Sequence, residues 1–401
     1  MATGEGLFPI MYPVTGFRLG TTSAGIKTPD RSDLVVMEIA EGSSVAALFT
    51  KNAFCAAPVI VCKEHLARCS PRYMLINTGN ANAGTGEQGL LDATHSCGVL
   101  ATSRGVDISA ILPFSTGVIG EYLPMDKLIA GIPRAVEKLS EQGWEEAAQG
   151  ILTTDTRPKG SSRQYGGDNL VTITGISKGS GMIKPNMATM LAYVATDACI
   201  DNELLHRALT IATEASFNRI TVDSDTSTND SVVLVATGAS DEVIDEVSFD
   251  PFVDQLSQVF TELAQAIIRD GEGASKFVSV VVERALSKAE ALNVAYTIAE
   301  SPLVKTALSA SDPNWGRILA AVGRSKIPEL DVNLVQISLN DVLIAEQGSR
   351  AETYSEEAGQ KAMQSEDIEI RVGLGRGDHS ETVWTSDLTQ EYVRINAEYR
   401  T

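Results

Sequence analysis

The chain has 401 residues and a formal net charge of −20, with 43% hydrophobic and 21% charged residues. This length can bury a large core and predicts two or more lobes. The negative charge argues against a general nucleic-acid or anionic-membrane binder, because both functions need a cationic surface. It does not exclude an anionic small-molecule substrate, since a pocket can be locally positive on an acidic protein.

The five cysteines contain no CxxC pair and the four histidines are scattered. This pattern is typical of reduced thiols in a cytosolic protein rather than of disulfides or a zinc site. The N-terminal residues show no basic segment followed by an apolar core, and no apolar run approaches the ~20 residues of a membrane span. We therefore expect a cytoplasmic protein without a signal peptide, a membrane span or a metal centre.

The first part of the chain predicts short strands separated by turn residues. The β-rich runs are residues 34–39, 45–49, 58–62 and 73–77. The last run leads into Asn77–Gly86, a loop rich in asparagine and glycine. Such a loop can form an amide-lined nest for a ligand. It can equally be a long turn whose asparagine side chains satisfy nearby backbone groups, and each asparagine taken singly favours the turn.

A second turn of interest follows the apolar run from Ile111. The segment Ile111–Gly120 predicts a strand that enters a tight turn at Ser115-Thr116-Gly117. Backbone amides in such a turn point outward and can hold a developing oxyanion. Helical spacing is predicted around it, for residues 90–102, 128–139 and 144–152. The polar segment 159–168 predicts an exposed loop, and residues 170–176 predict a half-buried strand.

The stretch Lys178–Leu191 joins a glycine-rich loop to an apolar run typical of a buried strand. Thr189 lies at that junction, after the small residue Ala188. Its hydroxyl could attack the Ala188 carbonyl and cut the chain, which would leave Thr189 with a free α-amine, a recognised activated nucleophile. Alternatively, the glycines only shape a turn and Ala188-Thr189 only begins a strand. The local residues by themselves favour this second interpretation.

Three segments partly resemble ligand-binding motifs but lack essential residues, and one carboxylate has two interpretations. Residues 218–230 are rich in acids but lack the glycine and terminal glutamate of an EF-hand calcium loop. Neither Gly373–Gly377 nor Gly175–Gly181 matches a dinucleotide or Walker motif. Glu272, between two glycines, is either a solvated carboxylate at a helix end or a contact for a ligand's amino group. Residues 392–401 alternate like a strand tied into the fold.

Mixed strands and helices without regular βαβ alternation favour α+β layers over a doubly wound sheet. Six motifs, in order, then make the whole chain resemble the ornithine acetyltransferase family, the bifunctional arginine-biosynthesis enzymes with glutamate N-acetyltransferase activity. They are Asn77–Ala83, Ser115–Gly120, Thr153–Thr156, Lys178–Met182, Pro185–Leu191 and Asp312–Arg317. One such motif is weak evidence, whereas six in family order are specific.

The resemblance implies self-cleavage of the Ala188–Thr189 bond and acetyl transfer by Thr189. The matching oxyanion donors are Thr116 and Gly117. The matching substrate contacts are Thr153, Lys178, Thr189, Glu272, Asn396 and Thr401, with Thr154 as the alternative to Thr153 in a repetitive motif. Within this scheme Lys178 would bind the substrates' α-carboxylate and Glu272 the side-chain ammonium of ornithine.

The resemblance also implies the architecture and the reaction. The fold is an α+β layered sandwich with two sheets between helices, like that of self-cleaving aminopeptidases of the N-terminal-nucleophile type. Residues 1–188 and 189–401 become the α and β chains, with a smaller C-terminal lobe at about 290–401. The acetyl group passes from N2-acetylornithine to glutamate without a metal or organic cofactor. Acetyl-CoA is a further donor in some members, and the expected assembly is a heterotetramer of two α and two β chains or larger.

Two alternatives remain at this point. One is a self-processed amidohydrolase or aminopeptidase, in which water accepts the acyl group. The other is an amino-acid-binding protein whose Ala188–Thr189 bond is never cut. Free acetate release would favour the first, and an uncut chain that binds ornithine would favour the second.

Overall fold

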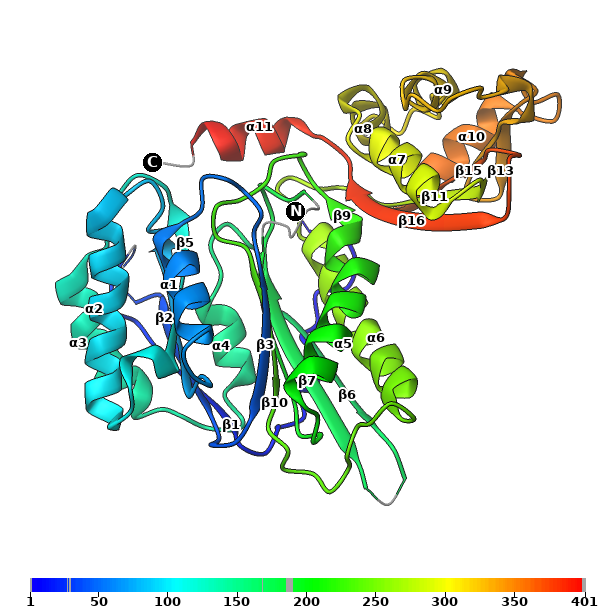
Figure 1. Ribbon diagram of the computed structural model, residues 1–401. Helices are drawn as coiled ribbons and strands as arrows, with labels where there is room; N and C mark the ends of the chain where they lie inside the picture. Colours follow the sequence, from blue (N-terminus) through cyan, green and yellow to red (C-terminus); the bar gives the residue numbers. More distant parts are fainter. Residues whose placement is uncertain (1, 27, 29, 168, 185–189, 399–401) are drawn as a thin grey trace. The chain divides into compact units, whose positions relative to one another are not determined.

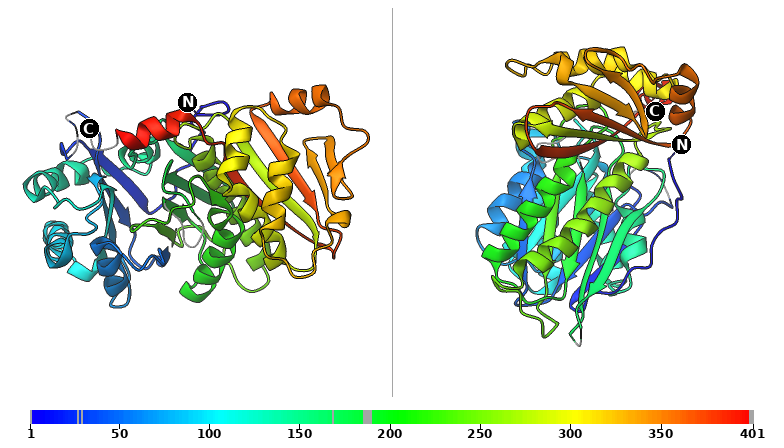
Figure 2. Two further views of the ribbon diagram at one scale, coloured as in Figure 1. Left: turned by 90° about the horizontal axis from the view of Figure 1, so that it is seen from above. Right: turned by 90° about the vertical axis from the view of Figure 1, so that its right-hand side faces the viewer.

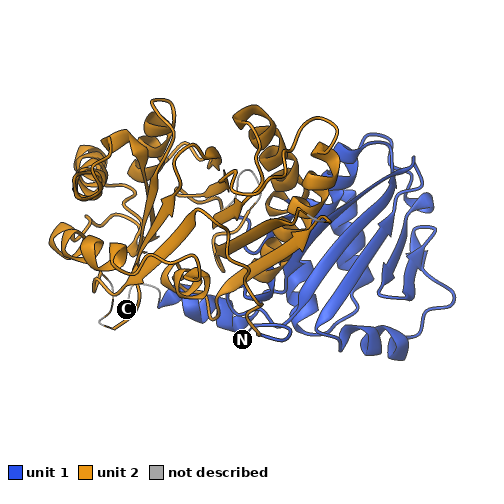
Figure 3. Cartoon of the chain, turned by 90° about the horizontal axis from the view of Figure 1, so that it is seen from below, with its two compact units in different colours: residues 1–6, 219–224, 268–401 blue, residues 7–218, 225–267 orange. Residues whose placement is uncertain are grey.

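The computed structural model describes residues 2–26, 28, 30–167, 169–184 and 190–398 (Figure 1). The chain divides into two compact units (Figure 3). The larger unit comprises Leu7–Asn218 and Asp225–Ile267, and the smaller comprises Met1–Gly6, Arg219–Ser224 and Ile268–Thr401. None of the described helices is long and apolar enough to cross a membrane.

The larger unit contains two sheets. The first has the order β1 (Phe17–Thr22), β2 (Leu34–Ile39), β4 (Tyr73–Asn80), β5 (Ile111–Val118). The second has the order β3 (Ser44–Phe49), β10 (Ser231–Ala236), β8 (Leu191–Thr196), β7 (Val171–Lys178), β6 (Lys159–Tyr165). Strands β4 and β5 pair in parallel, as do β8 and β10. Their near-continuous apolar runs are those expected of strands covered on both faces.

A single core joins the facing sides of these two sheets. It includes Phe114 of β5 and Tyr193 of β8, whose rings meet edge to face with centroids 5.2 Å apart. Trp144 of α4 (Trp144–Gly150) is buried in the same core. The sheets therefore pack face to face, with side chains of both filling the space between them.

Helices cover the outer faces of the two sheets (Figure 1). On the first sheet these are α1 (Ala57–Leu66), α2 (Gly86–Arg104) and α3 (Met125–Val136), and on the second α5 (Asn202–Ala215) and α6 (Phe249–Arg269). Short 3-10 turns lie at Ile108–Ala110, Phe217–Arg219 and Val332–Leu334. The result is the predicted α+β layered sandwich, with two sheets between helices.

Two predictions in this unit are wrong. Residues 58–62, predicted as a strand, lie in α1. A continuous apolar run does not distinguish a strand from a buried helix, and Pro58 occupies the first turn of α1, where proline's missing N–H is harmless. Residues 159–165, predicted as part of an exposed loop, form the edge strand β6, which pairs antiparallel with β7 along its whole length. Its polar composition is typical of an edge strand.

The smaller unit is built on a seven-stranded sheet. Its order is β14 (Ser349–Arg350), β13 (Val342–Glu346), β12 (Gln336–Leu339), β15 (Asp367–Gly373), β11 (Phe277–Ala285), β16 (His379–Ser386), β9 (Ile220–Thr221). The helices are α7 (Lys288–Ala299), α8 (Pro302–Ser309), α9 (Trp315–Gly323), α10 (Glu356–Met363) and α11 (Gln390–Ala397). Helix α7 packs across β11 and β16 (Figure 2). The longest segment of this unit is Ile268–Thr401, which includes β11.

Candidate active site

The two predicted oxyanion donors, Thr116 and Gly117, lie in β5, which continues to Val118, so the tight turn predicted at these residues is wrong. Thr116 is buried, and Gly117 has a φ of +137°, in a region that L side chains rarely adopt. A Cβ atom at Gly117 would lie 2.3 Å from the carbonyl carbon of Gly79 on the parallel neighbour β4. Position 117 therefore needs glycine, both for its dihedral angle and for the close approach of β4.

Two asparagines near the end of β4 support the backbone around the oxyanion donors. Asn77 Oδ1 accepts a hydrogen bond from the Ser115 hydroxyl (2.6 Å), and Asn77 Nδ2 donates to the Asn80 carbonyl (2.9 Å). Asn80 Nδ2 in turn donates to the carbonyls of Glu121 and Tyr122. The asparagine side chains thus satisfy backbone and neighbouring polar groups, as the second interpretation of this segment expects, although Asn77 and Asn80 lie in a strand.

Replacing Gly117 with alanine is expected to disrupt both the fold and the position of the oxyanion donors Thr116 and Gly117. Positive φ and the clash with Gly79 together should lower the free energy of unfolding by about 2–5 kcal/mol. Gly120→Ala is the matched control, because Gly120 also has a positive φ (+86°) but no atom within 4 Å of its Cβ position. Urea unfolding of both variants checks the difference, and equal midpoint shifts would contradict it.

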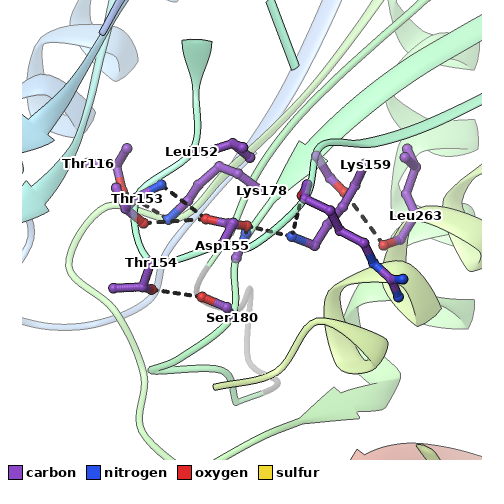
Figure 4. Close-up of polar contacts among 12 residues, drawn as sticks. Thr116, Leu152, Thr153, Thr154, Asp155, Lys159, Lys178, Ser180 and Leu263 are labelled. Carbon is purple, nitrogen blue, oxygen red and sulfur yellow. Dashed lines mark hydrogen bonds and ion pairs between the residues drawn. The ribbon is translucent and has the colours of Figure 1, made fainter. Parts of the chain in front are cut away.

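Lys178, at the end of β7, points its ammonium group toward Thr116 (Figure 4). The side chain is buried, and Nζ donates a hydrogen bond to Thr116 Oγ1 at 3.1 Å. Two predicted site residues that are 62 positions apart in the chain are therefore in contact. The cation comes from the second sheet and the hydroxyl from the first.

Asp155 binds three groups of the same region, although it is not among the predicted site residues. Its carboxylate is fully buried and accepts hydrogen bonds from Lys159 Nζ (2.6 Å), the Gly179 N–H (2.7 Å) and the Thr153 N–H (3.1 Å) (Figure 4). Burial raises the pKa of Asp155, but the ammonium groups of Lys159 and Lys178 and the hydrogen bonds outweigh it and hold the pKa well below the usual value. The only signal in the sequence was its place in the Thr153–Thr156 motif.

The balance of charge in this region is positive. Burial raises the pKa of Asp230, which also lies near Lys178, well above its usual range. The ammonium groups of Lys159 and Lys178 lie near the lowered-pKa carboxylate of Asp155. The net charge of these three groups is one positive unit, which suits an anionic ligand on an otherwise acidic protein.

The adjacent threonines Thr153 and Thr154 have different partners. The Thr153 N–H donates to Asp155, whereas the Thr154 hydroxyl lies 2.7 Å from the Ser180 hydroxyl. Arg31 holds the segment from the other side through the carbonyls of Leu152 and Thr153. The segment that precedes β6 is thereby tied to the glycine loop that follows β7.

In the smaller unit, Glu272 and Asn396 lie together. Asn396 Nδ2 donates to Glu272 Oε2 at 2.7 Å. Residues 392–397 belong to the helix α11, so the prediction of a strand there is wrong; the Thr389 side chain caps the helix by accepting from the Tyr392 N–H. Gly273 (φ +69°) lets α11 approach, because a Cβ there would lie 2.5 Å from the Tyr392 nitrogen.

Three of the predicted site residues, Ala188, Thr189 and Thr401, lie outside the described residues. The described residues closest to the predicted cleavage bond are Lys184 on one side and Met190 on the other, directly before β8. Within the described part of the chain, no group of three or more His, Cys, Asp or Glu side chains is arranged to hold a metal ion.

The chain is similar to known proteins over its whole length. The model of the ArgJ family matches residues 18–401. A relative from Pseudomonas fluorescens (strain Pf0-1), named arginine biosynthesis bifunctional protein ArgJ, is 56% identical, and the match covers 100% of both chains. The relative of the same name from Methylococcus capsulatus is 54% identical over 98% of this chain and 97% of its own. A crystal structure of the Bacillus halodurans protein of that name is 40% identical, covers 50% of this chain and 95% of its own, and has a TM-score of 0.48.

Proposed function

Because the chain belongs to the ArgJ family, we propose that it moves the acetyl group of N2-acetylornithine to glutamate through an acetyl ester on Thr189. The chain is an enzyme of arginine biosynthesis, and the products of this transfer are ornithine and N-acetylglutamate. The observation that carries the proposal is the contact between Lys178 and Thr116, since it joins a carboxylate-binding cation to an oxyanion donor.

Activation begins with cleavage of the chain. The Thr189 hydroxyl attacks the Ala188 carbonyl, the Ala188–Thr189 amide bond breaks to give an ester, and water hydrolyses the ester. The products are chains 1–188 and 189–401, the second with a free α-amine on Thr189. An α-amine has an unperturbed pKa of about 7.7–8.0, which suits a general base near neutral pH.

Acetyl transfer then follows a ping-pong sequence. Thr189 Oγ attacks the acetyl carbonyl while its own α-amine accepts the hydroxyl proton, and ornithine leaves with that proton on its nitrogen. The α-amine of glutamate next attacks the acetyl-threonine ester. N-acetylglutamate leaves, and the proton returns to the threonine oxygen. Acetyl-CoA would enter as an alternative donor in the first half of this sequence.

The oxyanion of each tetrahedral intermediate would be held by the Gly117 N–H and the Thr116 hydroxyl. A hydroxyl has one proton to donate and two lone pairs to accept. Because the Thr116 oxygen accepts from Lys178, its proton remains available to the oxyanion, and the ammonium polarises it further. Each such donor typically contributes ~3 kcal/mol to the stability of the transition state.

Lys178 would also bind the α-carboxylate that both substrates share. In N2-acetylornithine only N2 and Cα separate the acetyl carbonyl carbon from that carboxylate, so a cation beside the oxyanion donor fits an N-acetylated α-amino acid. The single net positive charge around Asp155 supports the same assignment. Glu272, positioned by Asn396, would bind the side-chain ammonium of ornithine, and Thr153 and Thr401 would complete the substrate contacts.

The proposal is tested by incubating the purified protein with N2-acetylornithine alone. Denaturing mass analysis should find fragments that meet at Ala188–Thr189, an acetyl adduct on the fragment 189–401, and about one ornithine released per chain. Adding glutamate should discharge the adduct as N-acetylglutamate. Continuous release of free acetate without glutamate would indicate a hydrolase instead, and an uncut, unmodified chain would overturn the proposal. Acetyl-CoA in place of N2-acetylornithine tests the second donor.

Replacing Lys178 with glutamine should remove the preference for an α-carboxylate. We expect kcat/KM for N2-acetylornithine to fall by about 10²–10³-fold, because a buried charge-assisted contact is lost. The carboxylate-free analogue N-acetylputrescine should be affected less, since it uses the cation only through Thr116. Kinetics with both donors check this, and a parallel loss for both would contradict carboxylate binding by Lys178.

We further propose that the α and β chains assemble as a heterotetramer or larger and that the enzyme acts in the cytoplasm. Light scattering of the mature protein measures the assembly directly. Fractionation of cells that produce it tests the location.

A further inference from the structure

Two neighbouring polar residues, Asn229 and Asp230, precede β10 of the second sheet, and both are buried. Asn229 Nδ2 donates to the Ser115 carbonyl (2.9 Å) and to the Ala81 carbonyl (2.7 Å). Ser115 directly precedes the oxyanion donors, and Ala81 directly follows β4. Asn229 therefore reaches from the second sheet to the ends of two parallel strands of the first sheet.

Asp230 contacts the other half of the site. Its carboxyl accepts a hydrogen bond from the Met190 N–H, and the N–H of the next residue, Ser231, donates to the Met190 carbonyl at 3.0 Å. Both backbone groups of Met190 are thus bound by this segment. Met190 follows Thr189 in the chain, so the proposed nucleophile is covalently bonded to the nitrogen that Asp230 binds.

We propose that Asn229 and Asp230 are positioning residues. They hold the oxyanion donors and Met190, the residue after the nucleophile, at a fixed separation. This inference rests on the proposed function. The oxyanion donors come from the first sheet and Met190 leads into the second, so their separation depends on how the sheets are joined at this end. A displacement of 1 Å at a reacting centre can lower a rate about 100-fold. The adjacent pair makes one rigid connection between the two halves.

The backbone around the pair is itself immobilised. The Asp230 carbonyl accepts from the Thr50 N–H (2.9 Å), the Ser227 carbonyl from the Thr50 hydroxyl (2.8 Å), and the Thr228 carbonyl from the Ala56 N–H (2.9 Å). All residues from Ser227 to Ser231 are buried. A segment held in this way can impose its geometry on the strands it contacts.

Protonation does not prevent Asp230 from performing this role. Its Oδ2 atom is buried and has no hydrogen-bond partner among the residues that the structure describes. An ionised oxygen in that position would lose its solvation without compensation. Burial raises the pKa of Asp230, and this shift is opposed by the Met190 N–H, the ammonium of Lys178, and hydrogen bonds from the side chain and backbone of Ser227. The function needs only the oxygen that accepts from Met190, which asparagine also supplies.

The test compares Asp230→Ala with Asp230→Asn in the full-length chain. Asp230→Ala removes the acceptor for Met190, so we expect self-cleavage and kcat to fall about 100-fold while the KM for N2-acetylornithine changes little. Asp230→Asn keeps an acceptor of the same shape and should restore both rates to within a few-fold. Loss of activity in both variants would show that the carboxylate is required, and wild-type rates in both would show that Asp230 has no positioning role.

Thr50→Val is the matched control for general destabilisation. It removes the hydrogen bond to Ser227 from the same segment but leaves the contacts to Ser115 and Met190, so its cleavage rate should match the wild type. If Thr50→Val slows cleavage as much as Asp230→Ala, the effect is structural and the proposal fails. Wild-type protein that neither cuts nor transfers acetyl would instead contradict the proposed function, which separates the two failures.

A pH series adds an independent readout of the neutral acid. A carboxyl whose folded-state pKa lies above the unfolded value of about 3.9 loses its stabilising contribution as pH rises. Asparagine does not titrate, so the melting temperature of Asp230→Asn relative to wild type should be higher at pH 8 than at pH 5. An unchanged difference between pH 5 and pH 8 would mean that Asp230 is ionised in the folded protein over this range.

Discussion

Thr189→Ala is expected to yield one uncut chain of 401 residues without measurable acetyl transfer. The substitution removes the hydroxyl that attacks Ala188 and, since the α-amine is released only by cleavage, it also removes the general base. Loss of a nucleophile that acts with its base as a unit typically lowers kcat by at least about 10⁴-fold. Denaturing mass analysis and a transfer assay on the same preparation measure the two effects together.

Thr189→Ser is the matched control, because serine keeps the hydroxyl and loses only the methyl group. It should still cut at the same bond and retain transfer, at a lower rate. A Thr189→Ala chain that still transfers acetyl would assign the nucleophile to another residue. A Thr189→Ser chain that remains uncut would mean that the methyl group is needed to hold the hydroxyl in position.

The layered fold could be predicted from the sequence where burial leaves a clear pattern. The run 232–236 is apolar throughout and the run 34–39 is interrupted only by Glu38, and both form strands covered on two faces. The run 58–62 is just as apolar and forms a helix, because it is buried by packing on β5 and α2 rather than by its own periodicity. Local pattern therefore predicts that a segment is buried more reliably than it predicts its conformation.

The candidate site was predictable only in part. The contact between Thr116 and Lys178 joins motifs far apart in the chain, and the family resemblance, not the pattern, singled out both residues. Asp155 and Asp230 were missed as site residues, since an aspartate in a polar segment is usually solvated. Their burial and the opposite directions of their pKa shifts arise from the tertiary structure. It places Lys159 and Lys178 beside Asp155, whereas Asp230 has Lys178 as its neighbouring lysine.

Asp155→Ala is expected to be the most destabilising single change in this region. It leaves the buried ammonium of Lys159 without its ion-pair partner, a loss that typically lowers the free energy of unfolding by about 3–5 kcal/mol. Arg163→Ala on the same strand β6 is the matched control. Arg163 pairs with Glu262 at the surface, where such pairs contribute about 0–1 kcal/mol. Urea midpoints of the two variants should differ accordingly, and similar shifts would contradict a structural role for the buried pair.

The pH dependence of Asp155→Asn distinguishes loss of charge from loss of packing. Asparagine preserves the shape, so a variant that remains strongly destabilised at pH 7 identifies the charge as the important property. The folded-state pKa of Asp155 is lowered, so its contribution is complete above the unfolded value of about 3.9 and is lost as pH falls toward the folded value. The stability difference between wild type and Asp155→Asn should therefore be constant from pH 5 to 7 and shrink below about pH 4. Asp230→Asn should behave in the opposite sense, gaining on the wild type as pH rises, because burial raises the pKa of Asp230 whereas the neighbouring ammonium groups hold the pKa of Asp155 low. A constant difference for Asp155→Asn down to pH 3 would show that its charge contributes nothing.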